Sequence, residues 1–286
     1  MLCLVTTQIN HWYQVKGDRK WKPLGELKDP VGIVTGGSSG LGSALVSELL
    51  TRYPNLVVVD VDKIPPKTRD ERLLYRECDL SNSADTVRLL QSLKRAYGKR
   101  ISLIINNAGI RLPYGDIRSM KEAEMRKIFD VNTFAPVSLL QELVPDGNDT
   151  TQQCYVVTIA STLGILAPAR VAAYAASKAA LMAFHLSFSA ELVAKRINHV
   201  RTLLVLPGQL NTEMFGGFEP PRQFFAPVVN VSSLARDIID RCEKGKRGCL
   251  EAPFYSHFAH LLMSMPYSLQ LVIRKFAKMD ECLPDE

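Results

Sequence analysis

Tyr174 and Lys178 form the residue pair whose types and spacing suggest chemistry most directly. They are four positions apart, which places both side chains on one face of an α-helix. A lysine there favours the ionised form of the tyrosine, because a nearby positive charge stabilises a phenolate. Such a tyrosine can accept or donate a proton near neutral pH. The alternative is a helix-surface pair without a catalytic role, since this spacing often arises by chance.

A glycine-rich turn upstream of this pair indicates a phosphate site. The apolar run 31–35 leads into the turn, and an amphipathic segment follows as far as Leu50. This order predicts a strand, a tight turn and a helix. Glycines let the backbone approach a ligand closely, and a helix N-terminus offers unpaired N–H groups to a pyrophosphate. The turn residues that we expect at the ligand are Gly36, Ser38, Ser39, Gly40, Leu41 and Gly42. An ordinary strand-to-helix turn is the alternative.

Asp60 is the candidate for binding a ribose. It closes the apolar run 56–60, which lies about 20 residues after the glycine turn. A carboxylate there accepts hydrogen bonds from ribose hydroxyls and repels a 2′-phosphate, so NAD is favoured and NADP is the alternative. We interpret Asp62 as a turn residue. The basic residues that favour NADP instead are Lys63, Lys67 and Arg69.

These motifs and those that follow resemble the short-chain dehydrogenases/reductases from Pro30 to Glu251. The matching motifs occur in the family's order and at similar spacing, which chance would rarely produce. They are Thr35-Gly36-x-x-x-Gly40-x-Gly42, Asp60, Asp79-Leu80, Asn106-Asn107-Ala108-Gly109, Asn132, Ser161, Tyr174-x-x-x-Lys178 and Pro207-Gly208-x-x-x-Thr212. The C-terminal segment loosely resembles the lipid-metabolising branch of this family, which includes retinol and hydroxysteroid dehydrogenases.

The resemblance implies roles for four catalytic residues. Tyr174 would be the acid/base, and Lys178 would lower its pKa and bind the nicotinamide ribose. Ser161 would hydrogen-bond the substrate oxygen. Asn132 would disturb its helix and position a water that relays protons to Lys178. Taken alone, Ser161 could instead be a helix cap or a strand-end hydroxyl, and Asn132 a capping or kink residue.

The resemblance also implies contacts along the length of a dinucleotide. Asp79 would hold the adenine amino group, with Leu80 beside it. The adenine-side ribose would be lined by Asn107, Ala108 and Gly109, and the nicotinamide end by Tyr174, Lys178, Leu210 and Thr212. The alternative for Asp79 is an N-cap of the helix expected near Ser83.

Apolar runs alternate with helical stretches along the chain, and this predicts the elements that position these residues. The runs are nearly continuous rather than alternating, which is typical of a buried parallel sheet. The expected strands are 31–35, 56–60, 73–77, 101–106, 154–160, 200–206 and 248–251. We therefore expect an α/β fold: a Rossmann-type, doubly wound, seven-stranded parallel sheet with helices on both faces. The expected organisation is an N-terminal extension 1–29, a NAD(P)-binding domain 30–252 and a C-terminal amphipathic tail 253–286.

Composition excludes several other classes. The chain has 286 residues, 47% of them hydrophobic, which suffices for one large core. Its net charge of +6 is spread over the sequence without an aromatic-interleaved basic groove, so we expect no nucleic-acid partner. The six cysteines form no Cys-x-x-Cys motif and indicate a reducing compartment. The histidines show no metal-ligand spacing, and we expect no metal site.

Two segments bear on the substrate and on membranes. The phenylalanine-rich loop 213–227 suggests an apolar lid over the substrate, and its alternative role is simply to anchor the loop. The tail 254–279 is amphipathic and basic, so it could lie in a membrane interface, close an apolar pocket or form a dimer contact. The aromatic and basic residues of 1–29 are compatible with membrane contact and equally with an extension that packs on the domain or is disordered.

The sequence thus predicts an enzyme that transfers hydride between a nicotinamide cofactor and a hydrophobic, lipid-like alcohol or carbonyl. We expect a cytoplasmic protein, and the alternative location is the cytoplasmic face of the endoplasmic reticulum or of lipid droplets. We also expect a homodimer or tetramer, because these assemblies are usual for the family. The alternative is a non-catalytic dinucleotide sensor or a membrane-interaction protein on the same fold.

Overall fold

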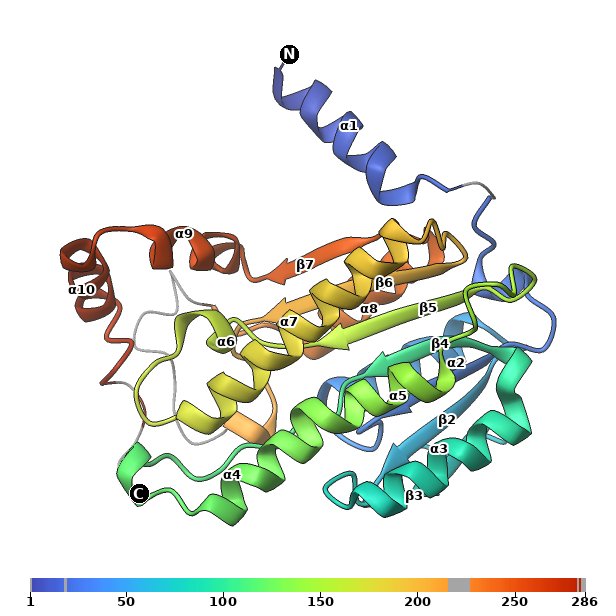
Figure 1. Ribbon diagram of the computed structural model, residues 1–286, viewed down its shortest axis with the longest axis horizontal. Coiled ribbons are helices and arrows are strands. Elements are labelled where there is room, and N and C mark those ends of the chain that lie inside the picture. The colour runs from blue at the N-terminus through green and yellow to red at the C-terminus, as the bar shows by residue number, and fades with distance from the viewer. Residues whose placement is uncertain (1, 18–19, 216–226, 282, 284–286) are drawn as a thin grey trace.

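The computed structural model describes residues 2–17, 20–215, 227–281 and 283, and residues 2–7 by their backbone alone. A seven-stranded parallel sheet forms its centre, in the order β3-β2-β1-β4-β5-β6-β7 (Figure 1). The strands are β1 (Val31–Thr35), β2 (Val57–Asp62), β3 (Leu73–Glu77), β4 (Ile101–Asn106), β5 (Cys154–Ile159), β6 (Val200–Pro207) and β7 (Gly248–Ala252). The order of the strands reverses between β1 and β4: β2 and β3 follow on one side of β1, and β4 to β7 follow on the other. In open α/β sheets, ligands bind at the carboxyl ends of the strands at such a switch point.

Helices cover both faces of the sheet, so the predicted doubly wound fold is confirmed (Figure 1). One face packs on α2 and α8, and the other on α3, α5 and α7. The helices are α1 (Leu2–Val15), α2 (Gly40–Arg52), α3 (Ser83–Tyr97), α4 (Glu122–Phe129), α5 (Ala135–Leu143), α6 (Leu163–Leu166), α7 (Ala172–Ala194), α8 (Val231–Glu243), α9 (Ala259–Ser264) and α10 (Tyr267–Phe276).

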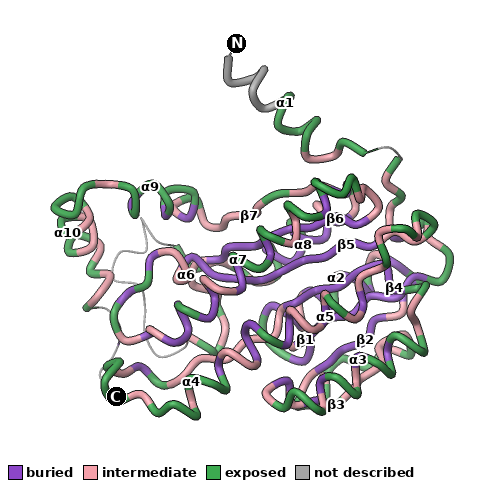
Figure 2. Tube along the Cα trace, viewed as in Figure 1, coloured by how far each residue is buried: buried purple, intermediate pink, exposed green. Residues whose placement is uncertain are grey.

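The central strands are apolar on both sides because both sides are covered. Successive residues of β1 face opposite layers: Val34 packs with α2 and α8, whereas Ile33 packs with α3 and α5. Both side chains are fully buried, and Figure 2 shows the same burial along the inner strands. This two-sided burial explains the continuous apolar runs from which the strands were predicted.

Strand β2 is the one that differs most from expectation. The other predicted strands agree to within one residue, but β2 ends at Asp62 rather than Asp60. The edge strand β3 extends the ladder, since Val61 pairs with Arg76 and Asp62 with Glu77. This longer strand decides which acid reaches the carboxyl edge of the sheet.

The N-terminal region contains a projecting helix and a packed connection. Helix α1 extends away from the body (Figure 1), and its end is held where Arg247 N donates to Gln14 O at 3.0 Å. Trp21 packs on Tyr155 of β5 and donates from its indole to Cys242 O at 3.0 Å. Residues after α1 therefore pack on the domain. The predicted boundaries at residues 30 and 253 stay a prediction.

The tail forms two short helices, α9 and α10, separated at Pro266 as a proline should separate them. Within the described part of the chain, no helix is long and apolar enough to cross a membrane. The cysteines whose side chains are described are free thiols: Cys78, Cys154, Cys242 and Cys249.

Candidate active site

The glycine turn between β1 and α2 has the shape that the sequence predicted. Gly36 and Gly40 adopt positive φ angles of 67° and 51°, which glycine tolerates without strain. A Cβ on Gly42 would lie 1.9 Å from the carbonyl oxygen of Gly36, so only glycine fits there. The Asn107 side chain fixes the turn from β4 by donating to Thr35 O and Gly36 O, each at 3.0 Å.

Asp60 lies beneath this turn and not on the cavity surface, contrary to expectation. Its side chain is fully buried, and its two oxygens accept from Gly37 N and Ser38 Oγ, each at 2.8 Å. Burial raises the pKa of Asp60 to about 6, although these hydrogen bonds oppose the shift. The acid that lines the cavity is Asp62, whose Oδ2 accepts from Ser38 N at 3.1 Å. The turn interpretation of Asp62 therefore missed its place at the strand end.

Asp79 lies farther along the same side of the cavity, followed by the buried Leu80. Its Oδ2 accepts from Lys63 Nζ at 2.7 Å, and its Oδ1 accepts from both the N–H and the hydroxyl of Ser81. These donors hold the pKa of Asp79 at about 2. Asn82 caps α3, so the capping alternative for Asp79 does not apply. Lys63, which argued for NADP, is already paired with a carboxylate.

Asn132 sits where α4 meets α5, in a π-helical turn that spans Asp130–Phe134. It is fully buried and exchanges two hydrogen bonds with Ile110: Ile110 N donates to its Oδ1 at 2.8 Å, and its Nδ2 donates to Ile110 O at 2.9 Å. Its Nδ2 also lies 3.0 Å from Ser177 Oγ of α7. The helix is thus disturbed at Asn132, as expected, and the amide ties the segment after β4 to the helix that carries Tyr174.

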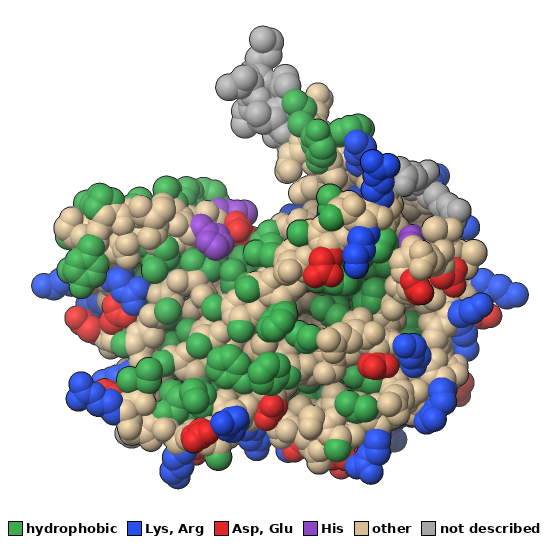
Figure 3. All heavy atoms as spheres, in the orientation of Figure 1, with side chains coloured by type: hydrophobic (Ala, Val, Ile, Leu, Met, Phe, Trp, Pro, Cys, Tyr) green, Lys and Arg blue, Asp and Glu red, His purple; other side chains and the backbone are tan. Residues whose placement is uncertain are grey.

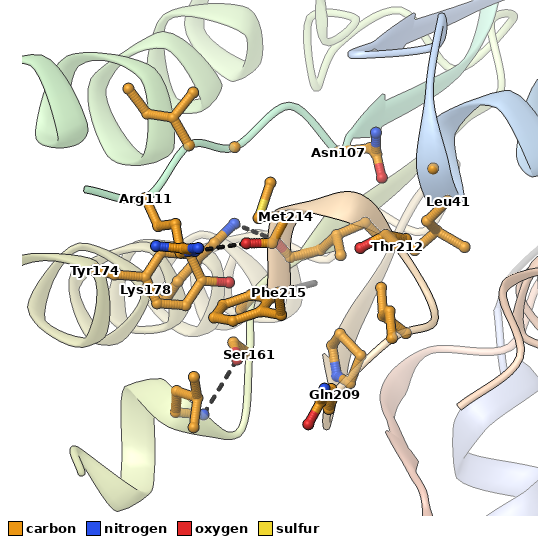
Figure 4. A pocket seen from close by; sticks show the side chains of 18 of the residues that line it. Leu41, Asn107, Arg111, Ser161, Tyr174, Lys178, Gln209, Thr212, Met214 and Phe215 are labelled. Atoms are coloured by element: carbon orange, nitrogen blue, oxygen red, sulfur yellow. Dashed lines mark hydrogen bonds between the residues drawn. The ribbon is translucent and has the colours of Figure 1, made fainter. Parts of the chain in front are cut away.

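Tyr174, Lys178 and Ser161 converge on the cavity from α7 and the end of β5 (Figure 4). Burial raises the pKa of Tyr174 to about 12, and a hydrogen bond with Ser161 opposes the shift. Burial also lowers the pKa of Lys178 to about 8. The ammonium donates to Ile159 O at 2.9 Å and lies 5.9 Å from the centre of the Tyr174 ring. In this arrangement burial governs the phenol, which stays protonated at neutral pH.

One cavity of about 1310 Å³ joins these groups. It runs from Asp62 and Asp79 over the glycine turn to Ser161 and Tyr174, and onward to the tail. The predicted residues that line it are Gly36, Ser38, Ser39, Gly40, Leu41, Asp79, Leu80, Asn107, Ala108, Gly109, Ser161, Tyr174, Lys178, Leu210 and Thr212. Of the predicted site residues, Gly42, Asp60 and Asn132 support its wall from behind.

Of the residues around the phenol, Met214 and Phe215 belong to the predicted lid 213–227, whereas Arg111 and Tyr114 were not anticipated. Phe215 stacks edge-to-face on Tyr174 with ring centroids 5.4 Å apart. Arg111 donates to Met214 O, and its guanidinium lies 4.1 Å from the centre of the Tyr114 ring, so it holds this segment in place (Figure 4). The position of Arg111, two residues after the Asn-Ala-Gly motif, was the available signal. Most of the predicted lid, residues 216–226, lies outside the described residues.

Beyond Tyr174 the cavity walls are strongly apolar. These walls come from α6, from the loop before α7 and from the tail. The tail therefore closes the pocket, which is one of the three roles predicted for it. The lining residues of this apolar chamber are Leu163, Leu166, Pro168, Leu262, Met265, Ile273, Met279 and Leu283.

Comparison with known proteins adds to this geometry. The short chain dehydrogenase family model matches residues 30–223. The chain is 53% identical to the uncharacterized oxidoreductase TDA5 of Saccharomyces cerevisiae over 277 residues, which cover 97% of this chain and 85% of that protein. It is 25% identical to human 17-beta-hydroxysteroid dehydrogenase 13 over 255 residues, with 85% and 81% of the two chains covered.

Solved structures show the same fold. A 3-ketoacyl-(acyl-carrier-protein) reductase from Brucella melitensis, complexed with NADH, superposes with a TM-score of 0.68 at 21% identity, covering 79% of this chain and 97% of that one. A short chain dehydrogenase from Burkholderia cenocepacia, in complex with NADP, gives a TM-score of 0.69 at 23% identity, covering 87% and 98%.

Proposed function

The chain belongs to the short-chain dehydrogenase family, and we propose that it is an enzyme transferring hydride between a nicotinamide dinucleotide and a hydrophobic alcohol or carbonyl. The observation that carries this proposal is the single cavity shared by the glycine turn and by Ser161, Tyr174 and Lys178. A site for a phosphate-containing ligand and a poised proton donor thereby lie in one space.

The turn fits a dinucleotide on the evidence of its own packing. A Cβ on Gly36 would lie 2.9 Å from the Ala108 Cα, and the Gly42 position is tighter still, so only glycine lets the turn keep this tight conformation. The N-terminus of α2 directs unpaired N–H groups toward the turn, which suits a pyrophosphate. When bound, the nicotinamide would supply or accept the hydride. Asp79 and Leu80 would hold its adenine end, and Leu210 and Thr212 its nicotinamide end.

The proton belongs to Tyr174. Its phenol is protonated at neutral pH, which is the form that a carbonyl reduction requires. Ser161 reaches the same oxygen by its hydrogen bond, so it can hold a substrate carbonyl beside the phenol. The Lys178 ammonium lies 5.9 Å from the centre of the Tyr174 ring, and in alcohol oxidation its charge would support the phenolate. Asn132 would keep α7 and the segment at Ile110 in register.

NAD is the preferred cofactor in this proposal, and Asp62 is the residue we assign to that preference. Its carboxylate lines the cavity at the end of β2, where a ribose 2′-hydroxyl would be bound. The buried Asp60 adds a second negative charge just beneath. Lys63 is neutralised by Asp79, although Lys67 also lines the cavity and favours NADP. We therefore keep NADP as the weaker alternative.

The apolar chamber supports a bulky, lipid-like substrate. Apolar walls favour apolar ligands because burial removes both surfaces from water. The sensor alternative is disfavoured, because a protein that only binds a dinucleotide needs neither a phenol at Ser161 nor a chamber beyond it.

Assembly and location complete the proposal. Phe134 of the π-helical turn and Phe184 of α7 are large exposed apolar side chains. They suit a contact with a second copy, in line with the expected dimer or tetramer. We retain the cytoplasmic location, next to a membrane or lipid droplet, as part of the proposal.

A turnover screen tests the reaction and the substrate class together. Straight-chain aldehydes and methyl ketones of increasing length are offered with NADH or NADPH. We expect kcat/KM to rise with chain length, since each buried methylene contributes about 0.8 kcal/mol. Best activity on small polar carbonyls would contradict the apolar chamber. Tight dinucleotide binding without turnover of any carbonyl would favour the sensor instead.

A further inference from the structure

The tail has an inner face that belongs to the active-site cavity. Leu262 and Met265 at the α9 end and Ile273 of α10 line the chamber. They pack with Leu166 of α6, next to the helix that carries Tyr174. Burial in the cavity thus explains why these residues of the tail are apolar.

Polar contacts fasten the tail in this position. Arg274 donates through Nη1 to Leu166 O at 2.8 Å and pairs with Asp280 at 2.6 Å. Asp280 Oδ1 also accepts a hydrogen bond from Ala169 N at 3.0 Å. These bonds join α10 to the loop between α6 and α7, so the tail is held as one wall of the site.

Other apolar side chains of α9, of α10 and of the 3-10 turn Phe254–Phe258 before them are exposed. Figure 3 shows hydrophobic side chains along the outer edge of the α9–α10 corner of the molecule, with basic and acidic side chains next to them. We call these side chains the outer ridge. Its members are Phe254, Phe258, Leu261, Met263, Tyr267, Leu269, Leu271, Val272 and Phe276.

The outer ridge is continuous with the chamber. Phe258 and Leu261 are 48% and 52% exposed, yet both also line the cavity. They therefore form a rim where the apolar chamber meets the apolar surface. A water-insoluble molecule on the outer ridge would reach the apolar chamber by way of the rim, and it would stay in contact with apolar side chains along that path.

Charge and length indicate what covers this ridge. Lys275 and Lys278 are exposed at its end, and within the described residues neither forms an ion pair, while Glu281 partly offsets their charge. Neither α9 nor α10 is long enough to span a bilayer. Short amphipathic helices with an apolar face and flanking lysines lie in the interface of a phospholipid layer.

We propose that the outer ridge of α9 and α10 docks on a phospholipid surface, and that the rim at Phe258 and Leu261 admits substrate directly from that surface. The admission step rests on the proposed function, whereas the docking step does not. A second copy of the chain is the competing occupant, and continuity of the ridge with the substrate chamber favours lipid over it.

Vesicle flotation of the purified full-length protein tests the docking. The probes are phosphatidylcholine vesicles with and without phosphatidylserine. The test variant carries Leu269→Glu and Val272→Glu, two exposed positions of α10. The matched control carries Val87→Glu and Val193→Glu, which are 41% and 71% exposed on α3 and α7. NADH binding and oligomeric state are measured for every protein.

We expect wild type and control to float with vesicles, more strongly with phosphatidylserine, and the α10 variant to lose at least ten-fold of its binding. NADH affinity should stay the same in all three, because the outer ridge does not touch the turn. Equal flotation of the α10 variant and wild type overturns the proposal. Absent flotation of wild type, together with a dimer that the α10 variant dissociates, overturns it in favour of a second copy.

The admission step is tested with a long-chain aldehyde dissolved in the vesicles and a short-chain aldehyde dissolved in water. The α10 variant should lose rate on the vesicle-borne aldehyde and keep its rate on the water-borne one. Equal loss on both overturns direct admission. Failure of the proposed function is recognised separately, because wild type would then reduce neither aldehyde while flotation could still succeed.

Discussion

Replacement of Gly42 by alanine should weaken dinucleotide binding while leaving the fold intact. The new Cβ would lie 1.9 Å from Gly36 O and 2.6 Å from Asn107 Nδ2, where ordinary contact begins near 3.4 Å. The carbonyl belongs to the turn itself, so the turn must shift by on the order of 1 Å. Overpacking of this kind costs about 1–3 kcal/mol, which corresponds to roughly 5- to 150-fold in affinity when it falls on the binding site.

The assay is titration with NADH followed by fluorescence, alongside thermal unfolding. Alanine is the better helix former by about 1 kcal/mol, so it offsets part of the strain and Tm should change by only a few degrees. Gly98→Ala is the matched control, because nothing lies within 4 Å of the Cβ it would add. Unchanged NADH affinity with a raised Tm in Gly42→Ala would refute the assignment of this turn to the pyrophosphate.

Three further changes test other parts of the site. Asp62→Asn should weaken NADH roughly ten-fold relative to NADPH in titrations, whereas Asp60→Asn should weaken both alike, because Asp60 supports the turn. Lys178→Met should raise Tm at pH 7, since burial lowers the pKa of this ammonium from 10.5 to about 8 and makes its charge costly in the fold. Between pH 8 and 10.5 the lysine is protonated in the unfolded chain but not in the folded one, so the stability of the wild type rises with pH. The Tm difference between Lys178→Met and wild type should therefore shrink over this range. A Tm difference that does not change with pH would contradict the buried-charge explanation. Asn132→Ala should lower kcat at least ten-fold with NADH affinity retained, and destabilise the fold by about 1–3 kcal/mol, because the Ile110 backbone loses its partner.

The strands of the sheet were predictable because the apolar pattern of each strand can be read from its own residues. Runs such as 101–106 are mostly apolar, and burial on both faces of the sheet makes that pattern stable. Glycine at positions 36 and 40 likewise permits the positive φ angles that the turn adopts there. The family motifs placed Ser161, Tyr174 and Lys178, and the fold brings these three to one cavity.

Other features depend on tertiary contacts that no local pattern contains. The end of β2 is set by pairing with the edge strand β3, so the sequence could not rank Asp62 above Asp60. The raised pKa of Tyr174 comes from burial by segments distant in sequence, including Phe215. The tail pattern was compatible with a pocket wall, a membrane surface or a dimer contact. The structure shows that part of the tail lines the pocket and that other apolar side chains of the tail are exposed.

Hydride transfer in Tyr174→Phe is the most direct test of the proposed mechanism. The substitution removes only the phenolic oxygen, so the ring can keep its contact with Phe215. Single-turnover oxidation of NADH by a long-chain aldehyde is measured together with the NADH dissociation constant. We expect NADH affinity within about two-fold of wild type. Hydride transfer should be slower by roughly 10²–10⁴-fold. An unchanged transfer rate would contradict the assignment of the proton to Tyr174.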